Sequence, residues 1–398
     1  MSTTAPGGDR PLPLDGVTVL DLGQIYQGPY AGFLMAMSGA RVIKVEPRRG
    51  EALRARGPTL PYAMLNSCKE TVTIDLKAPD GLALFRQLST EADVVLVNYA
   101  PGVPERLGID YDTLAAGNQR LIYAHASGFG LDDDAGVPAM DITVQAHMGV
   151  MSVTGFADGP PVKAGVALID FLGGTHLYGA ITTALFERER TGRGRSVEVT
   201  MADAAYITLA SNLGSWASTG RAGRTGNKHA ALGVAPYDVY RCADGHVALI
   251  AVTNRHWRSV LNVIGRVDLV NEPRFRHVTD RAAVMAEIDD LVEGWTSQRS
   301  RDEVVATLQG AHVPAAAVRV VDEVVRDRRQ IERRALQWHD HPDLGDVPLP
   351  HSPIRWHDSD LRVVEPSRGI GADTDHVLHD LLGLSATDIA DLRAAEVI

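Results

Sequence analysis

Strand and helix signals alternate along the first half of the chain, and this alternation constrains the fold more than any other feature. Short apolar and β-branched runs that indicate strands are separated by longer stretches of helical composition. Such alternation is typical of βαβ units, in which a mostly parallel sheet carries helices on its faces. The expected strands occupy residues 17–22, 41–46, 71–76, 93–98, 121–125 and 196–201, and the expected helices include residues 30–38, 79–89 and 171–187.

The second half of the chain has a different character. Residues 218–227 are rich in Gly, Arg and Thr and read as a linker or functional loop. Residues 234–252 then predict a hairpin that turns at the Asp-Gly pair ending at Gly245. Ser385, with Asp388 three residues later, has the form of a capping box for a last helix. The helices expected in this half occupy residues 255–264, 282–295 and 385–394.

Composition excludes several classes of protein. The chain has 398 residues, of which 45% are hydrophobic and 22% charged, enough for more than one domain with a buried core. The formal charge of −11, without a basic stripe interleaved with aromatics, argues against nucleic acid as a partner. No apolar run is long enough to cross a membrane, and residues 1–12 are expected to be a disordered tail rather than a signal peptide. Two widely separated cysteines, Cys68 and Cys242, indicate a reducing cytoplasm.

Asp170 is the most informative single residue. It follows the apolar run 164–169 and opens the expected helix, where free backbone N–H groups and the helix macrodipole favour an ionised carboxylate. Gly173 and Gly174 leave room for a ligand beside it. Asp170 therefore reads either as the helix N-cap or as a carboxylate nucleophile.

Polar residues after the expected strands indicate an anion-binding pocket. Gly23, Gly28 and Gly32 do not form the G-x-G-x-x-G pattern, which disfavours a nicotinamide-dependent dehydrogenase, although the helix that follows could still bind a pyrophosphate. Ligands of open α/β sheets bind near the ends of the strands, where a set of basic and amide side chains is expected here. The set comprises Arg48, Arg54, Arg56, Lys69, Asn98 and Arg106.

Two other groups could carry chemistry but are expected to be structural. His339, His341 and Asp343 are metal-ligand types, yet their spacing fits an exposed strand and a Pro-containing turn, so no metal site is predicted. Cys68 has no histidine close to it in the sequence and is predicted to be a structural thiol.

A series of short motifs, distributed over nearly the whole chain, gives a more specific indication. They are residues 27–29, 39–46, 65–67 with Lys69, 98–102, 106–108, 152–155, 158–161, 187–195, 226–227, and Gly371 with Thr374. In content and order these motifs resemble the class III CoA-transferases, the CaiB/BaiF family, to which formyl-CoA transferase, carnitine CoA-transferase and α-methylacyl-CoA racemase belong. No single motif is decisive, but their order is specific.

The resemblance implies a fold and an assembly. A Rossmann-like α/β large domain is expected from both ends of the chain, with a smaller α+β domain from the middle, in an interlaced ring-like homodimer. The implied ranges are 1–12 for the tail, 13–217 for the first part of the large domain, 218–233 for a linker, 234–330 for the small domain, and 331–398 for the return to the large domain.

The resemblance also implies site residues and ligands. By motif position, the family's nucleophilic aspartate falls on Asp170, and its substrate loop on Gly226 and Asn227. A coenzyme A thioester is then a substrate, with no tightly bound cofactor and no metal, and the partners are an acyl-CoA and a free carboxylic acid. The implied CoA-binding residues are Gln27, Arg48, Leu65, Asn66, Lys69, Asn98, Tyr99, Arg106 and Met140.

The implied reaction moves CoA from an acyl-CoA to a free carboxylic acid through an anhydride and a thioester on Asp170. Racemase members of the family instead carry a His before the Asp of the helix expected to begin at Asp141, and here that position is Met140, which cannot transfer a proton. His125 and His147 are expected to be structural. A transferase is therefore favoured over an α-methylacyl-CoA racemase, and over a non-catalytic CoA-binding homologue because Asp170 is retained.

Overall fold

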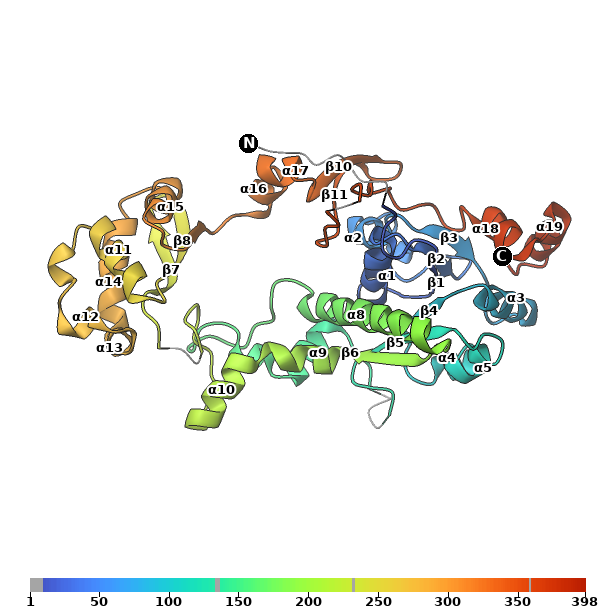
Figure 1. Cartoon of the computed structure of the whole chain (residues 1–398), viewed down its shortest axis with the longest axis horizontal. Coiled ribbons are helices and arrows are strands. Elements are labelled where there is room, and N and C mark those ends of the chain that lie inside the picture. The colour runs from blue at the N-terminus through green and yellow to red at the C-terminus, as the bar shows by residue number, and fades with distance from the viewer. Residues whose placement is uncertain (1–9, 133–136, 231–232, 358) are drawn as a thin grey trace. The chain divides into compact units, whose positions relative to one another are not determined.

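The computed structural model describes residues 10–132, 137–230, 233–357 and 359–398 (Figure 1). The chain divides into two units: one comprises the chain up to Met148, Val166–Tyr206 and Asp327–Ile398, and the other comprises Gly149–Gly165 and Ile207–Arg326. The second unit thus includes residues 149–165, which the expected boundaries assign to the large domain. Residues 1–9 of the expected tail and residues 231–232 of the expected linker lie outside the described residues.

The first unit is built on a parallel sheet, which confirms the predicted α/β class. Over the described residues the strand order is β3-β2-β1-β4-β5-β6, and every neighbouring pair is parallel. The strands are β1 Thr18–Asp21, β2 Arg41–Glu46, β3 Glu70–Thr73, β4 Val94–Val97, β5 Ile122–Ser127 and β6 Ser196–Thr200. All six fall within or beside a predicted strand, because buried parallel strands are short, apolar and β-branched.

Helices cover both faces of this sheet. Successive strand residues point to opposite faces, so that Val19 packs into the cluster with α1 and α8 while Leu20 packs into the cluster with α3 and α18. The helices of this unit are α1 Gln27–Met37, α2 Leu60–Leu65, α3 Pro79–Thr90, α4 Val103–Leu107, α5 Tyr111–Ala115, α6 Asp141–His147, α8 Leu168–Thr191, α17 Arg328–Glu332, α18 Thr374–Leu382 and α19 Ala386–Ala394, with the 3-10 turn η1 Arg54–Arg56. The hairpin β10 Leu336–His341 and β11 Gly345–Pro350 also belongs to it.

The second unit has its own antiparallel sheet and core. In the described part, the strand order is β7-β8-β9, and the hairpin of β7 and β8 closes at Gly245 as predicted. Trp257 and Tyr240 are buried in its core. Its elements are α7 Val150–Val153, α10 Ala210–Thr219, β7 Tyr237–Cys242, β8 Gly245–Ile250, α11 Asn254–Val263, η2 Val267–Leu269, α12 Pro273–Arg276, α13 Val278–Ala282, α14 Met285–Thr296, α15 Arg301–Gly310, β9 Ala315–Ala317 and α16 Val321–Val325, and α9 Met201–Thr208 crosses the boundary.

Some element bounds differ from the predictions. Helix α1 begins at Gln27 rather than at residue 30, because Pro29 is compatible with the first turn, where its missing N–H has no helical partner to lose. The helix predicted over residues 282–295 is preceded by the separate turn α13, and α14 begins at Met285. Within the described residues, none of the helices combines the length and apolarity needed to span a membrane.

The most extensive helix–helix contact of the first unit, among the described residues, joins α1 to α8, which lie side by side in Figure 1. Two glycines make it possible. A Cβ atom added at Gly173 would lie 2.5 Å from Nε2 of Gln27, and one added at Gly174 would lie 2.6 Å from the Gln27 carbonyl oxygen. The start of α1 is therefore pressed against the first turns of α8.

This contact predicts opposite effects of the same substitution at two positions of α8. Gly174→Ala forces the helices apart and is expected to destabilise the protein by about 1–3 kcal/mol through overpacking. Gly179→Ala has open space around the added methyl group and is expected to stabilise the helix by up to about 1 kcal/mol. Thermal unfolding of both variants tests this, and equal shifts in Tm would contradict the packing argument.

Candidate active site

The strand order creates a crevice at the carboxyl ends of β1 and β4. The chain leaves β1 towards β2 on one side, while β4 lies on the other, and ligands of open α/β sheets bind at such switch points. Asn98, directly after β4, ties the two loops together there. Its side chain accepts a hydrogen bond from the Gln24 N–H at 2.7 Å and donates one to the Gln24 carbonyl oxygen at 2.8 Å.

A buried ion pair fixes the loop between β1 and α1. The Lys69 ammonium group donates to the Asp21 carboxylate at 2.7 Å, to the Pro29 carbonyl oxygen at 2.9 Å and to Asn66 Oδ1 at 3.1 Å. Burial lowers the pKa of Lys69 to about 8, although Asp21 opposes this shift. Asp21 in turn accepts from the Gly23 N–H at 2.7 Å. Lys69 thus connects the end of β1 to the first turn of α1.

Asp170 lies on the wall of a cavity at this crevice. The cavity has a volume of about 180 Å³, and its wall also includes Gln27, Tyr99 and Met140. Asp170 is only 9% exposed and is the third residue of α8, whose N-cap position is Ala167. The interpretation of Asp170 as the N-cap is therefore wrong, and its carboxylate does not serve the helix terminus.

The expectation that the helix terminus favours the ionised form of Asp170 is not met, because the pKa of Asp170 is raised rather than lowered. Burial, together with the negative charge of Asp141, raises the pKa of Asp170 to about 7. The backbone N–H groups of Ile169 and Asp170 donate to Oδ2 of Asp141, at 2.8 Å and 3.3 Å. Asp141, the first residue of α6, thus occupies the helix terminus in place of Asp170.

A second cavity adjoins the first, and its lining carries three cations together with the carboxylates of Glu46, Asp75 and Glu396. Its volume is about 720 Å³, and it shares Gln24 and Tyr99 with the cavity at Asp170. Arg48, Arg49 and Lys77 line it, which provides cations for an anionic ligand such as a phosphate. Arg48 also bonds to the Glu396 carboxylate at 3.0 Å.

The predicted site residues fall into separate groups. Gln27, Asn98, Tyr99, Met140 and Asp170 line the same cavity, and Arg48 lines the adjoining one. The remaining residues lie elsewhere: Leu65, Asn66 and Lys69 are buried at and after the end of α2, Arg106 is exposed on α4, and Gly226 and Asn227 belong to the second unit. CoA contacts by all of these residues remain predictions.

Sequence reasoning missed several residues that line the site or support it. Gln24, Arg49 and Lys77 follow β1, β2 and β3, so the rule that flagged Arg48 and Asn98 could have found them. Asp141 gave no such signal, because its contact with α8 joins residues 28 and 29 positions apart. Only the packing of α6 against α8 shows it.

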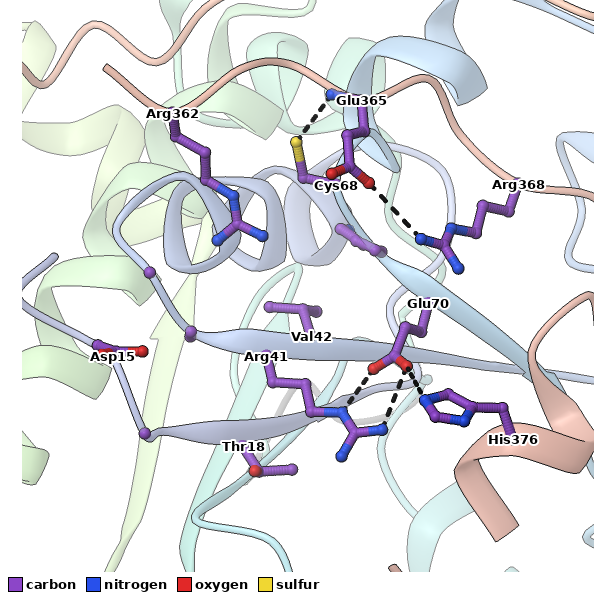
Figure 2. Close-up of a pocket in the computed structure, with 14 residues that line it drawn as sticks. Asp15, Thr18, Arg41, Val42, Cys68, Glu70, Arg362, Glu365, Arg368 and His376 are labelled. Atoms are coloured by element: carbon purple, nitrogen blue, oxygen red, sulfur yellow. Dashed lines mark hydrogen bonds and ion pairs between the residues drawn. The ribbon is translucent and has the colours of Figure 1, made fainter. Parts of the chain in front are cut away.

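The cavity at the opposite edge of the sheet is a weaker candidate (Figure 2). It lies at Thr18 and Arg41, the first residues of β1 and β2, whereas ligands bind at the carboxyl ends. Arg41 is held by Glu70 at 2.6 Å, and Arg368 lies 3.5 Å from Glu365. Carboxylates of the protein itself thus already engage two of its cations.

No histidine is among the described residues that line the cavity at Asp170. His125 lies within 2.9 Å of the Tyr99 carbonyl oxygen, and His147 packs edge-on against Phe129. His341 is buried against Ser367. In the part of the chain that the structure describes, no three His, Cys, Asp or Glu side chains are grouped so that they could hold a metal ion.

Fold and site together define an α/β protein with a buried carboxylate in a ligand cavity, beside a larger cavity that Arg48, Arg49 and Lys77 help to line. The sequence matches the family described as CoA-transferase family III over residues 14–374. The chain therefore belongs to CoA-transferase family III, the CaiB/BaiF family, and is a CoA-transferase.

Individual relatives agree with this assignment. The chain is 34% identical over 364 residues to an acetyl-CoA:oxalate CoA-transferase of Acetobacter aceti. The aligned residues cover 89% of this chain and 92% of that protein. It is 33% identical over 401 residues to a succinyl-CoA–D-citramalate CoA-transferase of Chloroflexus aurantiacus, covering 98% of each. A CaiB/BaiF family protein from Brucella suis has a crystal structure with a TM-score of 0.82 at 31% identity, covering 94% of this chain and all 100% of that one.

The raised pKa of Asp170 predicts a pH-dependent stability difference. A carboxyl group with a folded pKa of about 7 against 3.8 stabilises the fold while protonated, and this contribution is lost as the pH rises from about 4 to about 7. Asp170→Asn removes that loss and is expected to stabilise the protein above pH 7 by at most about 4 kcal/mol. At pH 4 the two proteins should differ little.

Thermal unfolding of the wild type and Asp170→Asn between pH 4 and pH 9 measures this difference. Asp203 is the matched control, because it is also the third residue of a helix, α9, but is exposed. Asp203→Asn should show no such pH-dependent gain, and a constant gap between Asp170→Asn and the wild type would refute the assigned pKa shift.

Proposed function

We propose that the protein transfers CoA from an acyl-CoA to a free carboxylic acid, with Asp170 as the nucleophile. One observation carries this proposal: among the described residues that line the cavity at the switch point, Asp170 is the only carboxylate. It lies in a cavity that adjoins a larger one of about 720 Å³, in which Arg48, Arg49 and Lys77 offer cations to an anionic ligand. Membership of the family supports the same reaction class.

The proposed chemistry begins with ionised Asp170. A carboxylate oxygen attacks the thioester carbonyl carbon, the C–S bond breaks, and CoA leaves as the thiolate, which gives a mixed anhydride. The thiolate then attacks the aspartyl carbonyl and expels the donor acid, leaving an aspartyl-CoA thioester. The acceptor carboxylate attacks this thioester, and the thiolate released finally attacks the new acyl group, so that acyl-CoA forms and the Asp170 carboxylate returns.

Gln27 is the side chain best suited to stabilise the oxyanions of these steps. Its amide nitrogen is buried and has no hydrogen-bond partner among the described residues. An unmade hydrogen bond of a buried donor is unfavourable, and a donor aimed into an active site is a common exception. An oxygen that develops negative charge beside Asp170 would accept a hydrogen bond from this amide group.

The adjoining groove supports binding of the nucleotide part of CoA. Arg48, Arg49 and Lys77 present positive charge on the same cavity. Tyr99 links this groove to the cavity at Asp170, and burial raises the pKa of Tyr99 to about 12, so that its phenol stays protonated and can donate. A ligand with phosphates in the groove would thus extend its other end towards Asp170.

The racemase alternative lacks the histidine that it needs in this cavity. Met140 lines it in the place where a histidine would be needed, and it is 51% exposed. No histidine or lysine occurs among its described lining residues. The acids named for the relatives, oxalate, D-citramalate and glutarate, form the first panel of acceptors to test.

The proposed mechanism predicts a covalent intermediate on Asp170. Incubation with acetyl-CoA or succinyl-CoA is expected to yield a CoA or acyl adduct on the peptide that contains Asp170, detected by intact-mass and peptide mass analysis. Asp170→Ala should lose the adduct entirely. Asp203→Ala, which removes an exposed carboxylate from the same position of helix α9, should retain it.

Two results would contradict the transferase proposal. One is an adduct that persists in Asp170→Ala. The other is deuterium exchange at the α-carbon of the acyl group without transfer of CoA to any free acid, which is the outcome expected of a racemase.

We also propose that the protein is a homodimer. Helix α10 has no buried residue, and its Trp216 is 60% exposed, while Phe186 on α8 is 66% exposed. Large exposed apolar side chains of this kind are typical of interaction surfaces. Sedimentation is expected to give twice the 42.8 kDa chain mass, and Trp216→Ser should shift the equilibrium towards the monomer. A monomeric wild type would refute the proposal.

A further inference from the structure

Asp141 makes three contacts that fix its carboxylate. Its Oδ2 accepts from the backbone N–H groups of Ile169 and Asp170, at 2.8 Å and 3.3 Å. Its Oδ1 accepts from the side-chain amide of Gln145, which is fully buried and lies one turn further along α6. The residue therefore joins the start of α6 to the start of α8, and its charge has a defined place.

These contacts decide what the terminus of α8 does. The first N–H groups of a helix usually stabilise a capping side chain or a bound anion. Here the backbone N–H groups of Ile169 and Asp170 donate to the carboxylate of Asp141 instead. Asp170 is thus left in a buried position beside a second negative charge, where the low local polarity strengthens their repulsion.

Other charged groups do not offset this repulsion. Helix α1, which packs against α8, contains Tyr30 as its only titratable residue, and the described lining of the cavity adds Tyr26 and Tyr99. Among those lining residues there is no lysine, arginine or histidine. On α6 the other titratable residue is His147, at the opposite end of the helix. Strands β5 and β6, which also pack against α8, carry Tyr123, His125 and Glu198. The Glu198 carboxylate accepts a hydrogen bond from the Ser127 hydroxyl group, whereas Asp141 is bonded to the backbone of Asp170 itself.

We propose that Asp141 is a positioning residue for the nucleophile: it fixes the first turn of α8 and holds a negative charge beside Asp170 that makes this carboxylate more reactive. The proposal rests on the proposed function of Asp170. A carboxylate that binds protons more tightly is also a stronger nucleophile. When Asp170 attacks the thioester, its charge leaves with the CoA thiolate, so the repulsion from Asp141 is relieved in the covalent intermediate.

The first test measures the interaction of the two carboxylates without any substrate. Asp141→Asn removes the charge but keeps an oxygen for the Ile169 N–H, and Gln145 can turn its amide to pair with the new side chain. With Asp141 intact, the difference in Tm between Asp170→Asn and the wild type should grow as the pH rises to about 7. In the Asp141→Asn background we expect this gap to shrink and its midpoint to move about one pH unit lower.

A purely structural role of Asp141 gives a different result. In that case Asp141→Asn would lower Tm by the same amount at every pH and leave the midpoint of the gap unchanged, which would overturn the proposal. Asp141→Ala, which also removes the acceptor, should lower Tm even at pH 5, where Asp170 is protonated. The comparison of Asn with Ala therefore separates the charge from the cap.

The second test uses the reaction. The pH midpoint for adduct formation with acetyl-CoA or succinyl-CoA should move lower in Asp141→Asn by the same amount as the thermal midpoint. The rate above pH 8 should fall by up to about tenfold, the most that a pKa change of about one unit can supply. An unchanged pH profile with an unchanged rate would overturn the proposal. If no adduct forms even in the wild type, the transferase proposal fails, while the thermal coupling still decides whether Asp141 and Asp170 interact.

Discussion

The buried ion pair between Lys69 and Asp21 is the interaction on which the arrangement of the site depends. Both side chains are fully buried, and such a pair is tolerated only when the remaining donors and acceptors are satisfied. Lys69 meets this condition through Pro29 and Asn66, and Asp21 through the Gly23 N–H. The ion pair thereby fixes the loop between β1 and α1 on its buried side, while Gln24 of this loop and Gln27 at the start of α1 line the cavity at Asp170.

The position of Asp170 follows from that anchored loop. Because the start of α1 is fixed, Gln27 can pack against Gly173 and Gly174, about one turn after Asp170 on α8. Gln27, Asn98 and Asp170 then share one cavity, with the larger cavity that contains Arg48 beside it. The same burial that shapes the cavity raises the pKa of Asp170, so geometry and reactivity have a common origin.

Much of the fold could be predicted because the signals are local. The β2 strand has the bounds read from the sequence, and the Ser385 capping box caps α19 as expected. Local patterns fail where a contact between distant residues decides the outcome. The cap of α8 comes from Asp141 rather than Asp170, and Lys69, expected on charge to bind a ligand, has its donors directed at the protein itself.

The sequence by itself determined the parallel α/β class, the family and some of the residues that gather at the switch point, because strand periodicity, turn residues and motif order are properties of the chain. Only the tertiary structure decided the electrostatic state of the site. Proton affinity depends on burial and on the charges within a few ångströms, and α6 brings Asp141 to Asp170 from 29 residues away. Asp170 is consequently not a carboxylate stabilised by its helix but one held beside a second negative charge.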